Sequence, residues 1–267
     1  MPSYVVTGAS RGLGYGFLTH LAQDPNNTVI GLVRSKPPVE VKLASSNLPN
    51  VHLLEADITS PTALVAAAKA TASITNGILD VLINNAAYIP SGHKTLDQYT
   101  PEQLETDMTA VLAANVTGVA QTINAFLPLI RAGTLKKVVT ISSGMADLGL
   151  VNKFSLATSA PYSVSKAAVN AIVAKYNAAL GPSQGILFFA LSPGVVATEG
   201  VANAMADEDE AANFAEMGKK FVEYAPDFKG PISVQESVGM CMNVIGKASV
   251  ETMGGEFVSH RGDKRWL

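Results

Sequence analysis

Tyr162 and Lys166 stand four residues apart, a spacing that places two side chains on one face of a helix. A nearby ammonium favours a phenolate and lowers the pKa of the tyrosine, so such a pair can give and take a proton near neutral pH. The same spacing also occurs by chance in many helices. Here it follows the run Val138–Ile141 and the hydroxyl groups of Ser142 and Ser143, which can hold a carbonyl oxygen. The pattern indicates acid–base chemistry at a carbonyl group.

The segment Thr7–Gly14 carries glycines at positions 8, 12 and 14, directly after the apolar run Tyr4–Val6. Glycines at this spacing permit a tight turn, close approach of a pyrophosphate to backbone N–H groups and close packing of the following helix. Glycines after a strand can also serve only to make a turn. Because these stand where the first strand meets the first helix, we favour dinucleotide binding. The residues predicted to contact the cofactor here are Gly8, Ser10, Arg11, Gly12, Leu13 and Gly14.

Arg34 follows the second predicted strand, where the adenosine ribose of a dinucleotide should lie. An acidic residue there would bind the free 2′-hydroxyl of NAD, whereas an arginine suits the 2′-phosphate of NADP. Arg11 in the glycine-rich turn could supply a second positive charge. The alternative is that Arg34 is an ordinary solvated residue. We expect NADP(H) to be preferred over NAD(H).

Short apolar or β-branched runs alternate with helix-length segments along the chain. Such runs are typical of a parallel sheet covered on both faces. We therefore expect an α/β fold, a single Rossmann-type doubly wound parallel sheet of about seven strands in one domain, 1–267. The predicted strands are Tyr4–Thr7, Thr28–Val33, Val51–Ala56, Leu79–Asn84, Lys137–Ser142, Ile186–Leu191 and Glu256–Val258. The predicted helices are Gly12–Ala22, Pro61–Ile74, Pro101–Ile130, Tyr162–Leu180, which Gly181-Pro182 should end, and Val234–Ile245.

Two longer segments, 144–161 and 199–230, interrupt this alternation. The second is either a solvated helix with an apolar underside or a lid over a site, because it follows the sixth strand at the end of the sheet where ligands bind. We favour the lid, and its apolar residues favour a hydrophobic carbonyl substrate. Phe154 either lines the substrate pocket or anchors its segment to the surface. The apolar residues of the lid are Phe214, Met217 and Phe221.

Composition narrows the classes of partner. The chain is 15% charged, and 19 Lys+Arg against 22 Asp+Glu give a net charge of −3, so nucleic-acid binding is not expected. The apolar run Ile186–Leu191 is far shorter than the ~20 residues of a membrane span. Without a secretory leader, a cytoplasmic protein is expected. The single Cys241 excludes a disulfide framework, and the 4 histidines lack metal-ligand spacing, so no metal site is expected.

Taken together, these residues resemble the short-chain dehydrogenase/reductase family, and the resemblance covers nearly the whole chain. Besides the glycine-rich turn, Tyr162 and Lys166, the matching elements in family order are Asp57-Ile58, Asn84-Asn85-Ala86-Ala87, Asn115, Ser143 and Pro193–Thr198. The ending Gly254–Val258, with Trp266 near the terminus, looks like that of fungal members allied to polyketide ketoreductases and of C-factor-like carbonyl reductases.

The resemblance implies a role for each matching residue. Tyr162 would protonate the carbonyl oxygen during reduction, and Ser143 would hydrogen-bond that oxygen. Lys166 would bind the nicotinamide ribose and lower the pKa of the tyrosine, and Asn115 would anchor a water that links the lysine to solvent. The remaining cofactor contacts would come from Asp57, Ile58, Asn85 and Ala86 on the adenosine side and from Val196 and Thr198 at the carboxamide.

The stretch between Ser143 and Tyr162 is longer than is usual in the family, which leaves Ser142 as an alternative to Ser143. We favour Ser143, because it lies just beyond the strand and can turn toward the site. The expected function is NADP(H)-dependent reduction of a ketone by a homodimer or homotetramer. The alternatives are an isomerase or dehydratase of the same fold and a non-catalytic NADP(H)-binding redox sensor. A sensor would be expected to lose the serine, the tyrosine or Lys166, yet all are present.

Overall fold

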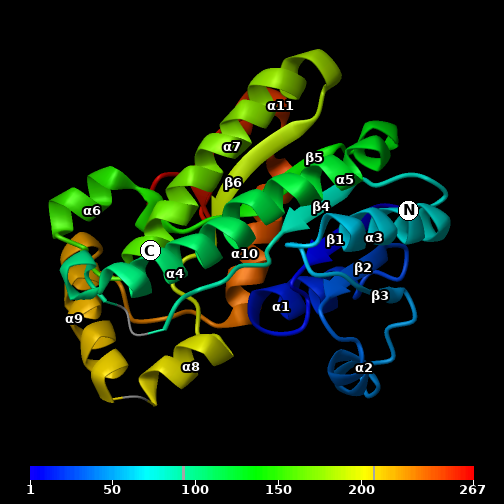
Figure 1. Cartoon of the computed structure of the whole chain (residues 1–267). Helices are drawn as coiled ribbons and strands as arrows, with labels where there is room; N and C mark the ends of the chain where they lie inside the picture. Colours follow the sequence, from blue (N-terminus) through cyan, green and yellow to red (C-terminus); the bar gives the residue numbers. More distant parts are fainter. Residues whose placement is uncertain (92–93, 207) are drawn as a thin grey trace.

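The computed structural model describes residues 1–91, 94–206 and 208–267. Its centre is a seven-stranded sheet in the order β3-β2-β1-β4-β5-β6-β7, in which every neighbouring pair is parallel (Figure 1). The predicted fold class is therefore confirmed. Because the order reverses between β1 and β4, ligands are expected at the carboxyl ends of the strands near this point. The strands are β1 (Ser3–Thr7), β2 (Thr28–Val33), β3 (Val51–Glu55), β4 (Val81–Asn84), β5 (Lys137–Ile141), β6 (Leu187–Ser192) and β7 (Phe257–Ser259).

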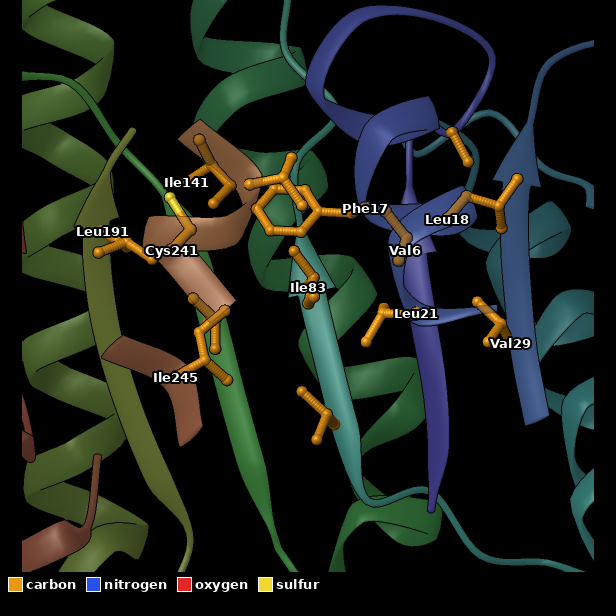
Figure 2. Packing of buried hydrophobic residues seen from close by; sticks show 14 of the residues in the cluster. Val6, Phe17, Leu18, Leu21, Val29, Ile83, Ile141, Leu191, Cys241 and Ile245 are labelled. Carbon is orange, nitrogen blue, oxygen red and sulfur yellow. The ribbon is translucent and has the colours of Figure 1, made fainter. Parts of the chain in front are cut away.

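Helices cover both faces of the sheet. On one face α1 (Gly12–Leu21) and α10 (Val234–Lys247) pack against the strands, and Figure 2 shows their Phe17, Leu21 and Cys241 beside strand residues. The other face is covered by α3 (Pro61–Thr75), α5 (Gly118–Ala132) and α7 (Ala160–Gln184). Cys241 is buried, and burial raises the pKa of its thiol to about 12, so this residue is a packed apolar group.

Two predicted helix starts are confirmed together with their caps. Ser60 accepts a hydrogen bond from the backbone N–H of Ala63 at 3.3 Å, and a proline follows it at the first helical position. Thr100 forms a reciprocal capping box with Gln103 at the start of α4 (Pro101–Leu112). Proline suits these positions because its missing N–H would have no partner inside the helix.

The predicted helix 101–130 contains a π-helical turn, η2 (Ala113–Thr117), between α4 and α5. Among the described residues this is the one helix that is long and apolar enough to cross a membrane. Its apolar residues Ile123, Phe126 and Ile130 are fully buried in the cluster under the sheet. We therefore describe it as a core helix.

The predicted end of the helix Tyr162–Leu180 at Gly181-Pro182 is wrong. Helix α7 continues to Gln184 and ends at Gly185, which has a φ of +65°. A proline removes one backbone donor, but in the final turn of a helix that already packs on the sheet the loss is small. Gly185 adopts the left-handed conformation that commonly stops a helix.

The segments without a predicted element contain short helices and the helices of the expected lid. These are α2 (Pro37–Leu43), η1 (Leu96–Gln98), η3 (Gly144–Ala146), α6 (Leu148–Phe154), α8 (Glu199–Met205), α9 (Glu208–Tyr224) and α11 (Val250–Met253). Position 207 of the expected lid lies outside the described residues. Figure 1 shows α8 and α9 beyond the sheet, and α9 lies near α6.

The apolar face of α9 packs against other parts of the chain. Phe221 is buried in a satellite core with Leu150, Leu156 and Trp266, and Met217 packs against this cluster. Phe154 also belongs to its rim, with its ring edge-on to Tyr224 at 5.4 Å between centroids. The structure therefore shows Phe154 in the anchoring role. That α9 closes over substrate stays a prediction.

Candidate active site

The glycine-rich turn brings the N-terminus of α1 to the carboxyl end of β1. Gly8 and Gly12 have φ values of +67° and +54°, which residues with a side chain rarely adopt. A Cβ atom on Gly14 would overlap the carbonyl oxygen of Gly8 and lie 2.5 Å from Nδ2 of Asn85. Gly8 and Gly12 are partly exposed and Gly14 is closely packed, an arrangement that suits the approach of a dinucleotide pyrophosphate to the backbone.

Asn85 and Ala86, predicted as adenosine contacts, hold this turn from the end of β4. The backbone N–H groups of Asn85 and Ala86 donate to Oγ1 of Thr7 at 3.0 and 2.9 Å. The Asn85 amide donates to the carbonyl oxygen of Thr7 at 3.0 Å. These bonds fix two neighbouring strand ends to each other. These bonds leave the predicted contacts of Asn85 and Ala86 with a cofactor possible, and those contacts stay predictions.

Three cations lie near the part of the turn where the adenosine of a cofactor is predicted to bind. Arg11 and Arg34 are exposed, at the start of α1 and the end of β2. The third, Lys42 of α2, was missed by the sequence analysis. Its Nζ donates to the carbonyl oxygen of Ser10 at 3.3 Å and lies 3.7 Å from a carboxylate oxygen of Glu199. The pair Pro37-Pro38 at the start of α2 was the available signal for the helix that carries it.

Asp57 and Ile58 follow β3 as expected. Oδ1 of Asp57 accepts hydrogen bonds from the backbone N–H and hydroxyl of Thr59 at 2.8 and 2.7 Å. These bonds, and then the nearby Arg34, hold the pKa of Asp57 below its usual value. The side chain of Ile58 is buried, and its carbonyl oxygen lies close to Gly118 of α5. Asp57 is thus a fixed anion beside the predicted adenosine site.

The two candidate serines have different partners. The buried Ser142 hydroxyl donates to Oδ1 of Asn170 at 2.7 Å, which directs it into α7. Ser143 lies one residue further, where its Oγ accepts from the backbone N–H of Met145 at 3.2 Å and hydrogen-bonds Tyr162. The structure therefore brings Ser143, rather than Ser142, to the tyrosine.

Tyr162 and Lys166 occupy successive turns of α7, and Nζ of Lys166 lies 5.6 Å from the centroid of the tyrosine ring. The lysine is 3% exposed, and its ammonium donates to the carbonyl oxygen of Ile141 at 2.7 Å. Burial lowers the pKa of Lys166 to about 8. The structure thus places a half-buried phenol beside a buried cation.

Burial also raises the pKa of Tyr162 to about 12, although the hydrogen bond with Ser143 lowers it in part. Desolvation of the phenolate is the largest cause of this shift. The lowering of the tyrosine pKa expected from Lys166 stays a prediction. At neutral pH the tyrosine is a proton donor.

Asn115 lies in the π-helical turn η2 and is fully buried. Its amide pairs with the backbone of Tyr88, accepting at 2.7 Å and donating at 2.8 Å, and it also donates to Oγ of Ser165 at 2.9 Å. The side chain therefore ties the loop after β4 to α7. The water expected between Asn115 and Lys166 stays a prediction.

Val196 and Thr198 lie after β6, opposite the glycine-rich turn. Val196 is buried and forms a parallel bridge with Ile232. The backbone N–H of Thr198 donates to the carbonyl oxygen of Val196 at 2.9 Å. A Cβ atom on Gly12 would meet the Thr198 methyl at 3.6 Å, so the threonine side chain lies beside the turn. The glycine-rich turn, the cations and the proton donor all fit a bound nicotinamide dinucleotide.

Comparison with known proteins agrees with this site. The family model described as short chain dehydrogenase matches residues 3–209. The chain is 50% identical to the short-chain dehydrogenase/reductase AacuF of Aspergillus aculeatus and 45% identical to the short chain dehydrogenase virK of Hypocrea virens, with 100% of each chain covered. It also resembles the NADPH-bound carbonyl reductase from chicken fatty liver, with a TM-score of 0.78, 25% identity and 98% coverage of both chains.

Proposed function

The chain belongs to the short-chain dehydrogenase family, and we propose that it is an NADP(H)-dependent reductase of carbonyl compounds. The observation that carries this proposal is the meeting of Ser143 and the buried Lys166 at the phenol of Tyr162. A binding protein without catalysis has no need for a buried cation beside a phenol, because burying a charge costs free energy.

In the proposed reaction a ketone becomes an alcohol. A bound reduced nicotinamide would supply the hydride to the carbonyl carbon. Tyr162 donates its proton to the carbonyl oxygen as negative charge develops there. The Ser143 hydroxyl donates a hydrogen bond to the same oxygen and holds it beside the phenol. The carbon thus gains the hydride, and the oxygen gains the proton.

Lys166 serves the phenolate that remains after this transfer. Its ammonium lies close to the ring and carries a positive charge at neutral pH, because its pKa of about 8 is still above that pH. The charge stabilises the phenolate and favours release of the tyrosine proton. The bond to the Ile141 carbonyl oxygen orients the ammonium.

We propose NADP(H) as the cofactor because Arg34 stands at the end of β2, with Arg11 at the start of α1. Both side chains are exposed and free to meet a 2′-phosphate. The chicken carbonyl reductase holds NADPH, which supports this choice. We further propose a small hydrophobic ketone as substrate, a homodimer or homotetramer as the assembly, and a cytoplasmic location.

The proposal is tested by mixing the purified protein with NADPH or NADH and a panel of apolar ketones. We expect consumption of NADPH in step with alcohol formation, slower use of NADH, and almost no turnover by Tyr162→Phe. Tight NADPH binding without turnover in either direction across the panel would favour a redox sensor. A product formed without net consumption of NADPH would favour an isomerase or dehydratase.

A further inference from the structure

Trp266, the single tryptophan of the chain, is the penultimate residue, and the mechanism above gives it no role. Its side chain is 3% exposed and lies in the satellite core. The indole stacks on Phe257 of β7 at 4.3 Å between ring centroids, with 14° between the planes. The stacking fixes the ring in one orientation, so its edges can make directed contacts.

The first of these contacts is with the turn that carries Ser143. A Cβ atom on Gly144 would lie 2.7 Å from Cβ and 3.1 Å from Cγ of Trp266, so backbone and indole already touch. At the other end of the turn, Nε1 of Trp266 donates to Oδ2 of Asp147 at 2.8 Å. One side chain therefore contacts both ends of a turn only five residues long.

The turn itself is tightly closed. The N–H of Ala146 donates to the carbonyl oxygen of Ser143 at 2.9 Å, and that of Asp147 donates to Gly144 at 3.0 Å. The Ser143 Oγ accepts from Met145 within the same turn. These hydrogen bonds leave the backbone of the turn little conformational freedom. A shift of Gly144 or Asp147 must therefore move the Ser143 hydroxyl.

Trp266 is also linked to two helices, to α6 through Asp147 and to α9 through its own backbone. Oδ1 of Asp147 accepts from the N–H groups of Gly149 and Leu150 at 2.8 and 3.1 Å, and so caps α6. The backbone N–H of Trp266 donates to the hydroxyl of Tyr224, the last residue of α9, at 3.2 Å. Through its indole and its backbone, Trp266 thus joins the turn, α6 and the expected lid.

We propose that Trp266 is a positioning residue that sets the Ser143 hydroxyl against Tyr162 and couples that setting to the docked position of α9. The inference rests on the proposed role of Ser143 in holding the carbonyl oxygen. A misplaced serine weakens transition-state stabilisation more than it weakens substrate binding, because the hydrogen bond strengthens as charge develops. Loss of the clamp should therefore lower kcat and leave KM nearly unchanged.

The indole–carboxylate bond is tested with Trp266→Phe, which keeps an aromatic ring on Phe257, and with Asp147→Asn, which keeps an oxygen for the α6 cap. Each should lower kcat about threefold to tenfold, the range of one hydrogen bond. The NADPH dissociation constant should stay within about twofold, because the glycine-rich turn is untouched. The double variant should lose no more than either single variant, because both remove the same bond.

Gly144→Ala tests the other end of the clamp, and Gly239→Ala in α10 is its matched control, since a Cβ there meets no atom within 4 Å. Because the chain has one tryptophan, indole fluorescence reports on the clamp without any turnover. Gly144→Ala and Asp147→Asn should shift the emission to the red and increase quenching by acrylamide. Gly239→Ala should change neither the emission nor kcat.

The outcomes separate this inference from the proposed function. If the wild type reduces no ketone, the proposed function fails, and the fluorescence of the variants alone decides whether Trp266 holds the turn. If Trp266→Phe and Asp147→Asn lower the melting temperature but leave kcat unchanged, the tryptophan only fills space. Unchanged emission in both Gly144→Ala and Asp147→Asn would overturn the clamp itself.

Discussion

At the scale of single residues, the half-buried phenol of Tyr162 has a pKa that is subject to opposing influences. Desolvation raises its pKa to about 12, while the hydrogen bond with Ser143 favours the phenolate. Burial meanwhile lowers the pKa of Lys166 to about 8. The acid thus holds its proton at neutral pH, and the cation beside it remains charged. This arrangement suits a donor that must release a proton only when negative charge appears on a substrate oxygen.

Replacement of Tyr162 by phenylalanine tests the donor directly. The ring and its packing are kept, but the hydroxyl that would protonate the developing alkoxide is lost. We expect the rate of hydride transfer to fall about 10²–10⁴-fold, the range of general acid catalysis. NADPH affinity should change little, because Lys166 and the glycine-rich turn remain. The measurement is single-turnover kinetics with a fluorescence titration of NADPH, and turnover within a few-fold of wild type would contradict the mechanism.

Arg34 is the residue expected to select the cofactor. Arg34→Asp places a carboxylate beside Asp57, whose pKa is already held low, so a 2′-phosphate would meet two negative charges. We expect NADPH affinity to fall about tenfold to a hundredfold, the range of charge-assisted hydrogen bonds, while NADH affinity is kept. The ratio of kcat/KM for the two cofactors measures this change. Arg131→Asp on α5, far along the chain from the turn, serves as the control, and an unchanged ratio in Arg34→Asp would refute the assignment.

At the scale of elements, local sequence signals explain what could be predicted. Short apolar or β-branched runs predicted the strands, and the prolines after Ser60 and Thr100 mark two of the predicted helix starts. The π-helical turn at 113–117 has no local signal, because its backbone is set by Asn115 bonding the distant Tyr88. The continuation of α7 past Pro182 likewise depends on packing against the sheet, which local propensity does not report.

Gly14→Ala tests the junction of β1 and α1. The new methyl group would overlap the Gly8 carbonyl oxygen, which cannot move freely because Asn85 and Thr7 hold the adjacent backbone. We expect a loss of about 3 kcal/mol in the free energy of unfolding, with weaker NADPH binding. Urea unfolding and a binding titration measure the two effects. Gly218→Ala in α9, where a Cβ meets nothing within 4 Å, should be neutral or stabilising, and equal behaviour of both variants would contradict this account.

At the scale of the whole molecule, the parallel sheet collects residues that are distant in the chain. Most of the motif residues could be predicted to lie together because they directly follow strands, and all strand ends of one direction lie at one edge. Asn115, Tyr162 and Lys166 lie within helices instead. The hydrogen bond from Ser142 to Asn170 directs Ser142 away from the site and so distinguishes it from Ser143. Residue spacing alone does not predict this bond. The bond between Trp266 and Asp147 spans 119 residues and has no sequence signal either. Long-range partners thus mark the limit of prediction from the sequence.

His260 couples the C-terminal segment to acid stability. The imidazole is 3% exposed and lies against Gly194, and its Nδ1 has no hydrogen-bond partner in the described part of the chain. Burial, and then the charge of Arg261, lower its pKa to about 4, while Asp263 opposes this shift. The unfolded chain takes up a proton near pH 6.5, which the folded protein binds only near pH 4.

The free energy of unfolding should therefore fall as the pH is lowered from about 6.5 to about 4, by up to ~3 kcal/mol from this residue alone. Above pH 6.5 both states are neutral at this position, so the contribution there is constant. His260→Gln cannot take up the proton, and the difference between wild type and variant should narrow as the pH is lowered through this window. Urea unfolding of both proteins at pH 7 and pH 4.5 measures this, with the exposed His20→Gln as control. The carboxylates titrate equally in both proteins, so only His260 can make the two pH profiles of the unfolding free energy differ. If the two profiles are parallel, the buried imidazole does not limit acid stability.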